Sequence, residues 1–392
     1  MTGAFLPYGC QSIDEADIRA VVEALKSSHL TQGPSVGRFE EKLSGILDAP
    51  FVSAVASGTA ALHLAYAALG LGPGDAIITS PLTFLATANA ARHLGADVAF
   101  GDVDDCGNLD PDSVEALITP ATRGIVAVHF AGLPADVERL RSIADRHGLW
   151  LVEDAAHALG ARIGTSPVGA CTFSDATTFS FHPVKHVTTG EGGAVSTRRA
   201  DLKQKIDRLR EHGIERRPAA DSEGHYGYVM HELGWNYRLS DVSSALGLSQ
   251  LDKLPAWLAH RAEIARRYRT GFARLDPRLL RCTPELAGRH SAHHLFPLLI
   301  DFARLDLMRG RVMGLLKERG IGTQVHYIPV CDQPYYSQRG SWHCPKARSF
   351  YRSELSVPMY STLGQADVER VVTGVSEVIE RRTSAVVYAK GP

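Results

Sequence analysis

Lys185 is the residue in this 392-residue chain whose type and surroundings most suggest chemistry. It stands in the segment Phe179-Ser180-Phe181-His182-Pro183-Val184-Lys185-His186, after an expected apolar strand, and in a loop that continues into Thr188-Thr189-Gly190-Glu191-Gly192-Gly193. A lysine amine attacks carbonyl groups when burial or neighbouring cations lower its pKa. A solvated side chain is the common explanation for a single lysine, but this context favours a nucleophile. His182 and His186 flank it without the spacing of metal ligands, and we expect no metal site.

A second candidate is Asp154, which comes directly after the apolar run 149–153. A carboxylate at a buried strand end is costly unless it has a partner. A cationic ring nitrogen would be such a partner, and the carboxylate would in turn keep that nitrogen protonated. Capping of the following segment explains Asp154 equally well. The aspartate alone therefore leaves both interpretations open.

A third candidate is the segment Ser57-Gly58-Thr59-Ala60, which leaves an expected strand and opens an expected helix. Small residues and free backbone N–H groups at a helix N-terminus bind phosphate well. For this segment taken alone, an ordinary helix cap is the more frequent explanation.

Short apolar runs alternate with helical periods, and this pattern predicts β-α-β units and a mostly parallel sheet covered on both faces. Ligands of such sheets bind beyond the carboxyl ends of the strands, where the three candidates lie. The alternation of strands and helices changes after Gly193, and we expect a domain boundary near residues 251–257, around Pro255. The expected strands are 51–56, 76–79, 98–100, 125–129, 150–153, 295–300 and 323–327, and the expected helices are 13–27, 59–69, 84–94, 135–147, 199–210, 241–251, 258–275, 304–319 and 365–381.

The composition is that of an ordinary soluble protein, with 44% hydrophobic and 22% charged residues. Lys plus Arg number 42 against 43 for Asp plus Glu, so nucleic acid and acidic membranes are not expected partners. Six scattered cysteines fit a reducing compartment. No signal peptide is expected, and the uncharged stretch 49–74 divides into a strand and a helix, too short for a membrane span. We therefore expect a cytoplasmic protein.

The order of a phosphate loop, a strand-end aspartate and a loop lysine is the logic of a pyridoxal phosphate (PLP) enzyme. At these residues the chain resembles the sugar-nucleotide aminotransferases of the DegT/StrS-type family, which have the aspartate-aminotransferase fold (fold type I). The resemblance runs essentially end to end. It is carried by the motifs Ser57-Gly58-Thr59-Ala60-Ala61-Leu62, Glu153-Asp154-Ala155-Ala156-His157-Ala158-Leu159-Gly160, residues 179–193 and Asn236-Tyr237-Arg238.

The resemblance implies an N-terminal arm (1–12), a large PLP-binding domain (13–252) and a smaller α+β C-terminal domain (253–392). The large domain would hold a mostly parallel seven-stranded sheet sandwiched by helices. Lys185 matches the Schiff-base lysine and proton shuttle, and Asp154 matches the partner of the pyridine nitrogen. The remaining implied cofactor contacts are Phe84 stacked on the ring, Gly58, Thr59 and Ser180 at the phosphate, Asn236 reaching the neighbouring subunit's site, and His157, which stands where many relatives carry Gln.

Within the family, the Phe-His-Pro-Val-Lys loop and several short stretches are most similar to the branch that serves pseudaminic acid biosynthesis. That similarity implies a homodimer with shared active sites. It also implies that L-glutamate is the amino donor and that C4 of a UDP-linked 4-keto-6-deoxy-N-acetyl-hexose is the acceptor. The implied substrate contacts are Tyr8, Ser28, His29, Leu30, Thr31, Ser57, Gln324, Val325, His326 and Tyr327.

Three alternatives remain open at this stage. The enzyme could aminate another nucleotide-linked keto sugar, of the 4-aminoarabinose or perosamine type. A sugar dehydratase of the same fold normally has histidine in place of the lysine, so Lys185 argues against it. A PLP-binding regulatory protein without turnover would not need the proton shuttle, so the complete residue set argues against it as well.

Overall fold

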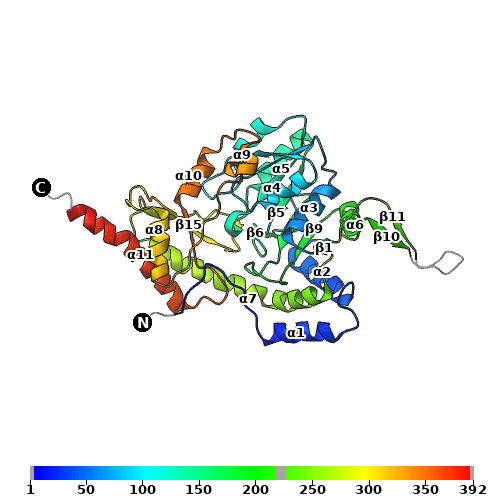
Figure 1. Ribbon diagram of the computed structural model, residues 1–392, viewed down its shortest axis with the longest axis horizontal. Coiled ribbons are helices and arrows are strands. Elements are labelled where there is room, and N and C mark those ends of the chain that lie inside the picture. Colours follow the sequence, from blue (N-terminus) through cyan, green and yellow to red (C-terminus); the bar gives the residue numbers. More distant parts are fainter. Residues whose placement is uncertain (1–3, 218–226, 389–392) are drawn as a thin grey trace.

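A seven-stranded sheet forms the centre of the molecule (Figure 1). The computed structural model describes residues 4–217 and 227–388. Strand β9 runs antiparallel to both of its neighbours, and all other neighbouring strands are parallel. The mostly parallel seven-stranded sheet implied by the resemblance is therefore confirmed. In spatial order the strands are β1 (Phe51–Val55), β9 (Gly193–Thr197), β8 (Ala176–Ser180), β5 (Trp150–Asp154), β4 (Thr122–Val128), β2 (Ala76–Thr79) and β3 (Asp97–Phe100).

Helices cover both faces of this sheet because its strands alternate buried side chains between two apolar cores. In β4, Val126 belongs to one core, whereas Ile125 and Ala127 belong to a core on the other face. This pattern is typical of a parallel sheet covered on both sides. The first core packs against α3 (Gly58–Ala68), α4 (Ala86–His93) and α6 (Ala200–Leu209). The cores on the other face pack against α2 (Pro34–Leu47), α5 (Val137–His147) and the first half of α7 (Asp241–Phe272).

A separate apolar core organises the C-terminal part of the chain. Its small antiparallel sheet has the order β12 (Leu280–Cys282), β14 (Phe296–Ile300) and β15 (Glu354–Val357), and α8 (Arg309–Glu318) and α11 (Gln365–Tyr388) pack against the same core. Residues near the N-terminus join it, since Leu6 bridges Ile321. The division into an arm and two domains stays a prediction.

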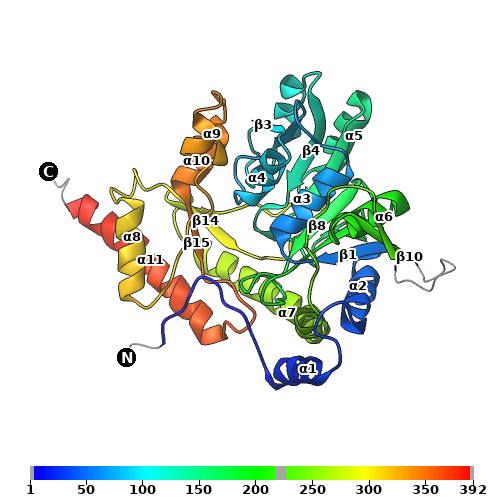
Figure 2. The same cartoon turned by 45° about the vertical axis from the view of Figure 1, so that its right-hand side comes forward.

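Helix α7 (Asp241–Phe272) lies between the two parts (Figure 2). It is one helix that contains Pro255 without a break. We expected two helices separated at this proline, because proline lacks an N–H and clashes with the preceding turn. Burial on both sides explains the continuity. Leu251 and Leu254 pack in a core of the large sheet, and Ile264 and Tyr268 pack in the C-terminal core.

The expected strand over residues 323–327 is wrong. Only Gln324 pairs, through an isolated bridge to Ser356, and the residues after it are irregular. The side chains of His326 and Tyr327 face the interior of the molecule, whereas Gln324 and Ile328 are exposed, so no regular alternation is present. The segment is therefore held by its neighbours and not by strand pairing of its own.

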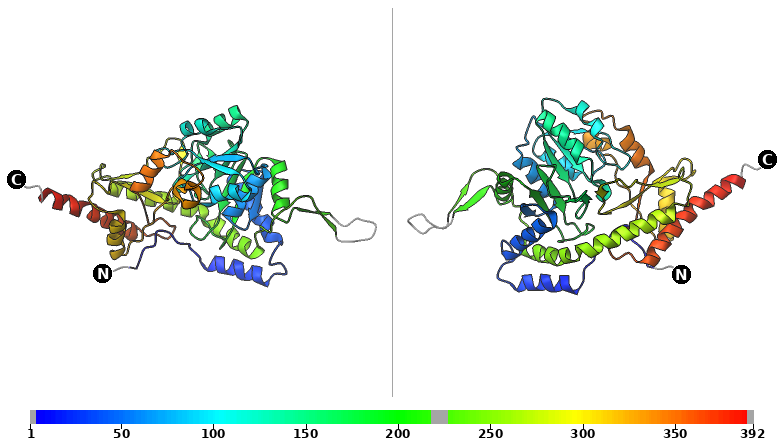
Figure 3. Two further views of the ribbon diagram at one scale, coloured as in Figure 1. Left: turned by 45° about the horizontal axis from the view of Figure 1, so that its top comes forward. Right: turned by 180° about the vertical axis from the view of Figure 1, so that it is seen from behind.

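Helix α1 (Glu15–Lys26) lies along α7, as both views of Figure 3 show. The buried Asp17 fixes it there, because Lys253 Nζ lies 2.8 Å and Gln250 Nε2 lies 2.7 Å from its Oδ2. The apolar side chains that predict this helix from the sequence are Ile18, Val21, Val22 and Leu25, and none of them is buried. Ile18 and Leu25 are 46% and 57% exposed, so the helix presents an apolar surface to the outside.

The other predicted helices and strands are present, and their ends differ from the predicted ends by at most five residues, except that α11 continues seven residues beyond its predicted end. No helix within residues 4–217 and 227–388 has the length and apolar character needed to cross a bilayer. The remaining elements are β6 (Arg162–Ile163), β7 (Ser166–Pro167), β10 (Ile214–Arg217), β11 (Gly227–Met230), β13 (Arg289–His290), α9 (Pro334–Ser337), α10 (Pro345–Ser353) and the 3₁₀ turns Pro111–Ser113, Glu115–Leu117, Phe130–Gly132 and Val330–Asp332.

Candidate active site

A cavity of about 600 Å³ opens at the carboxyl ends of β4, β5 and β8. Two sets of residues from distant parts of the chain enclose it. We call Ser57–Thr59, Asp154 and Ser180–Lys185 the strand-end wall, and we call Tyr8 with residues 324–327 the loop wall. The predicted site residues that line the cavity are Tyr8, Ser57, Gly58, Thr59, Phe84, Asp154, His157, Ser180, Lys185, Gln324, Val325, His326 and Tyr327.

Lys185 lies in a turn that follows β8, where its backbone N–H donates to the carbonyl oxygen of His182 at 2.9 Å. Burial lowers the pKa of Lys185 to about 8, although the charge of Asp154 opposes that effect. An amine with this pKa is partly neutral near pH 7, which is the form that attacks a carbonyl carbon.

Asp154 is the last residue of β5, and only 5% of it is exposed. Its Oδ2 accepts a hydrogen bond from Thr87 Oγ1 at 2.7 Å, and its Oδ1 accepts from the backbone N–H of Ala156 at 3.1 Å. Thr87 in turn contacts Thr83 at 2.7 Å. Thr87 was not predicted from the sequence. It lies four residues after Thr83, and only Phe84 of this segment was matched to the family. These contacts hold the carboxylate at the cavity surface.

The start of α3 approaches Ser180 so closely that only glycine fits at position 58. A Cβ added to Gly58 would lie 2.8 Å from the Cβ of Ser180. Ser57 caps the helix, since its Oγ accepts from the backbone N–H of Ala60 at 3.1 Å. The helix N-terminus and the Ser180 side chain therefore meet at one corner of the cavity, which is where a phosphate fits best.

Two histidine rings lie at the back of the cavity with their centroids 4.3 Å apart, those of His157 and His294. Burial lowers the pKa of both well below the usual range, so both rings are neutral. His157 Nε2 lies 3.3 Å from the hydroxyl of Tyr327, while the Nδ1 atoms of both rings are buried without a hydrogen-bond partner among the described residues. Ordered water or a bound group satisfies buried polar atoms of this kind. The sequence does not predict that His294 lines the cavity, because the pair His293-His294 belongs to no recognisable metal-binding motif.

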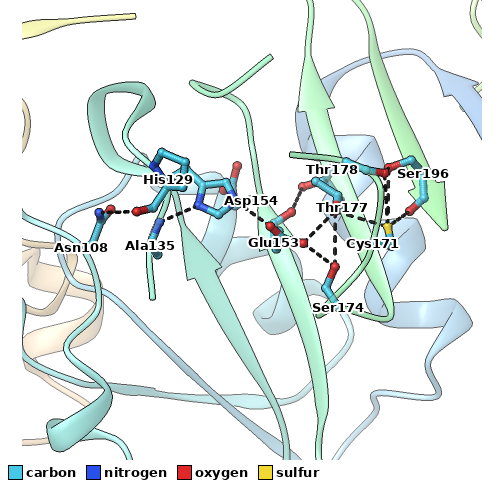
Figure 4. A network of polar contacts seen from close by, with 12 residues as sticks. Asn108, His129, Ala135, Glu153, Asp154, Cys171, Ser174, Thr177, Thr178 and Ser196 are labelled. Carbon is cyan, nitrogen blue, oxygen red and sulfur yellow. Dashed lines mark hydrogen bonds and ion pairs between the residues drawn. The ribbon is translucent and has the colours of Figure 1, made fainter. Parts of the chain in front are cut away.

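A polar network lies behind Asp154 within the sheet (Figure 4). His129 Nε2 donates to Glu153 Oε2 at 2.8 Å, and His129 Nδ1 accepts from the backbone N–H of Ala135 at 3.0 Å. Burial alone would raise the pKa of Glu153, but hydrogen bonds from His129, Ser174 and Thr177 hold it below the usual value. The network fixes strand β5, which carries Asp154, because both carboxylate oxygens of Glu153 have hydrogen-bond partners on the other face of the sheet.

Five predicted residues do not reach this cavity. Ser28, His29, Leu30 and Thr31 are exposed after α1, and Asn236 is exposed near α6. Phe84 lines the cavity mouth and is 61% exposed. Within the described residues, no group of three or more His, Cys, Asp or Glu side chains could hold a metal ion.

A mostly parallel sheet with a loop lysine, a buried strand-end carboxylate and a small-residue helix start defines a PLP-dependent transferase. Comparison with known sequences gives the family. The chain belongs to the DegT/DnrJ/EryC1/StrS aminotransferase family, which it matches over residues 11–376. Solved structural neighbours include a PLP form and a PMP form, and this enzyme uses the same cofactor.

Two curated relatives and one solved structure are similar along nearly their whole length. The chain is 39% identical over 383 residues to the spore coat polysaccharide biosynthesis protein SpsC of Bacillus subtilis, covering 96% of this chain and 97% of that protein. It is 38% identical over 381 residues to the UDP-4-amino-4,6-dideoxy-N-acetyl-beta-L-altrosamine transaminase of Campylobacter jejuni, covering 96% and 98%. Helicobacter pylori PseC, an aminotransferase involved in the biosynthesis of pseudoaminic acid, has a TM-score of 0.90 at 33% identity, covering 96% and 100%.

Proposed function

We propose that this sugar aminotransferase moves the amino group of L-glutamate to C4 of a UDP-linked 4-keto-6-deoxy-N-acetyl-hexose. The observation that carries the proposal is the two-walled cavity. Its strand-end wall has the groups that PLP needs, and the loop wall brings Tyr8 and residues 324–327 within the same enclosed space. The similarity to the Campylobacter jejuni transaminase supports this particular sugar.

In this proposal each residue of the site has a distinct role. The bound cofactor supplies an electron-withdrawing ring that stabilises negative charge on the amino-bearing carbon. Asp154 accepts a hydrogen bond from the ring nitrogen and keeps it protonated. Lys185 Nζ would take the proton from the amino-bearing carbon of glutamate and pass it to the cofactor, and in the second half of the reaction it would carry a proton from the cofactor to C4 of the sugar, since its lowered pKa lets it act as base and acid near neutral pH. Gly58, Thr59 and Ser180 hold the phosphate, His157 and Phe84 contact the ring, and Ser57 contacts the sugar.

Product identification tests the choice of sugar. The holoenzyme and L-glutamate would be offered UDP-4-keto-6-deoxy-N-acetyl-hexoses, 4-keto-arabinose and perosamine-type precursors, and 3-keto sugars in parallel. Mass spectrometry and NMR should show a new amino group at C4 of the UDP-linked N-acetyl sugar. Faster turnover of one of the other sugars would overturn this assignment, and cofactor binding without turnover of any sugar would favour a regulatory protein.

The proposal includes a cytoplasmic homodimer whose two sites are shared. Asn236 and the Ser28–Thr31 segment are exposed outside the cavity of their own chain, and they lie near apolar side chains that a partner would cover. Leu233 is 77% exposed and Leu25 is 57% exposed. Self-complementary burial around a two-fold axis would cover both.

Subunit mixing tests the shared site. Asn236→Ala and Lys185→Ala would each spoil a different half of every site. Exchange between the two variants should restore activity to at most about half per dimer, since one site regains both residues. Demonstrated exchange without any recovery would contradict the shared site.

A further inference from the structure

A line of hydrogen bonds runs from the cavity into the interior of the C-terminal sheet. His326 lines the cavity, and its Nδ1 lies 2.9 Å from Ser356 Oγ. Ser356 Oγ lies 2.6 Å from Glu354 Oε1. The other carboxyl oxygen of Glu354 accepts the backbone N–H of His326 at 2.7 Å. The loop wall is thus attached to a buried acid through the ring of one histidine.

All three residues are rigidly held. Glu354 and Ser356 are fully buried in β15, and His326 is 5% exposed. The backbones of Ser356 and Gln324 exchange two hydrogen bonds, of 2.8 and 3.1 Å, which fix the segment against the strand. The imidazole therefore keeps Nδ1 toward Ser356, and Nε2 is the ring nitrogen left to serve the cavity.

The serine hydroxyl has one hydrogen and can donate only one hydrogen bond, so the protonation state of Glu354 determines which nitrogen of His326 carries a hydrogen. If Glu354 is ionised, the hydroxyl donates to it, and His326 Nδ1 must then donate to the hydroxyl. His326 Nε2 would then carry no hydrogen and could only accept a hydrogen bond. If Glu354 carries a proton, it donates to the hydroxyl, the hydroxyl donates to Nδ1, and Nε2 carries the hydrogen.

We propose that Glu354 is a positioning residue that, through Ser356, makes His326 present an Nε2–H donor to the oxygen atoms of the bound nucleotide sugar. The keto, hydroxyl and diphosphate oxygens of such a substrate are acceptors, so a donor at this place favours binding. The inference rests on the proposed function only for the identity of the sugar, because the tautomer is a property of the free enzyme.

The surroundings favour the protonated acid. Burial raises the pKa of Glu354 to about 8, although its hydrogen bonds and the charge of Arg309 oppose that rise. Arg309 is occupied, since its guanidinium bonds the backbone carbonyls of Tyr351 and Glu354. Burial, assisted by the charge of Lys185, lowers the pKa of His326 to about 3 and keeps the ring neutral. The other titratable groups facing the pair are Tyr8, whose ring lies 5.7 Å from that of His326, Tyr327, and His157, which interacts electrostatically with His326.

The test combines Glu354→Gln and Ser356→Ala with a control, Ser376→Ala, which removes a buried hydroxyl without a partner among the described residues. Glutamine mimics the protonated acid permanently, because its amide N–H can donate to Ser356. Long-range ¹H–¹⁵N correlation spectra of histidine-labelled holoenzyme identify the tautomer of His326, with His326→Gln assigning its signals. We expect Nε2–H in the wild type below pH 8, a change to Nδ1–H above it, and Nε2–H at every pH in Glu354→Gln.

Kinetics supply the second readout. Ser356→Ala should raise KM for the nucleotide sugar roughly five- to tenfold, the effect of one hydrogen bond, and leave KM for glutamate unchanged. Ser376→Ala should keep both values near those of the wild type, and Glu354→Gln should raise KM for the nucleotide sugar less than Ser356→Ala does. An Nδ1–H tautomer in the wild type below pH 8, or the same change of tautomer in Glu354→Gln, would overturn the inference. Failure of the proposed sugar to react would leave these spectra unaffected, so the two failures are distinguishable.

Discussion

The two walls of the cavity are built in different ways. Each part of the strand-end wall ends or follows a strand of the large sheet, so the sheet itself places Ser57–Thr59, Asp154 and Lys185 at one edge. The loop wall has no strand of its own. Tyr8 is fixed by its carbonyl oxygen, which accepts from the N–H of Met359 at 3.0 Å, and residues 324–327 are fixed by β15. The proposed cofactor side is therefore set by the topology of the sheet, and the proposed sugar side by packing against a second sheet.

The largest expected effect comes from removing the nucleophile of the strand-end wall. Lys185→Ala should abolish turnover and the visible absorbance of the lysine-linked cofactor, because the variant has no amine in the cavity to form the bond. Steady-state assays and an absorbance spectrum check this. Residual activity without an added amine would show that the wall was assigned the wrong nucleophile.

Asp154→Asn should lower kcat roughly 10²- to 10⁴-fold, the usual range for a proton-transfer function, while the fold stays intact. The amide cannot keep a ring nitrogen protonated. Thermal unfolding followed by circular dichroism is the control for the fold. Near-native turnover would mean that Asp154 is only a cap.

Thr87→Val tests whether Asp154 of the strand-end wall needs the hydrogen bond that Thr87 donates to it. The substitution removes the 2.7 Å hydrogen bond to Asp154 Oδ2 and should reduce kcat about tenfold, the effect of one hydrogen bond to a charged group. Thr83→Val is the matched control, since its hydroxyl contacts Thr87 and not Asp154. Equal losses in both variants would contradict a specific role for Thr87.

The smallest expected effect is a shift in a pH profile. The apo-enzyme should bind PLP at a rate that rises as pH increases and levels off above about 8, because only the neutral amine of Lys185 reacts. Asp154→Asn should move the midpoint to lower pH, since the charge of Asp154 favours the protonated lysine. Stopped-flow absorbance measures both. A midpoint near that of free lysine would contradict the effect of burial.

Sequence reasoning reached the strand-end wall because its parts are contiguous motifs at predictable strand ends. It also identified residues 324–327, but only by resemblance, and it assigned them a strand that does not exist. Thr87 and Glu354 were missed because their roles depend on contacts across elements, Thr87 with Asp154 and Glu354 with His326. Periodicity cannot predict such pairs. The continuity of α7 through Pro255 was missed for the same reason, since packing on both sides overrides the local effect of proline.

Borohydride reduction of the holoenzyme, followed by peptide mass spectrometry, tests the central claim most directly. Reduction converts the bond between lysine and cofactor into a stable amine. The account predicts one cofactor-bearing peptide, and it contains Lys185. A modified lysine elsewhere, such as Lys203 with its ion pairs to Glu40 and Asp207, or an active enzyme without any modified lysine, would contradict it.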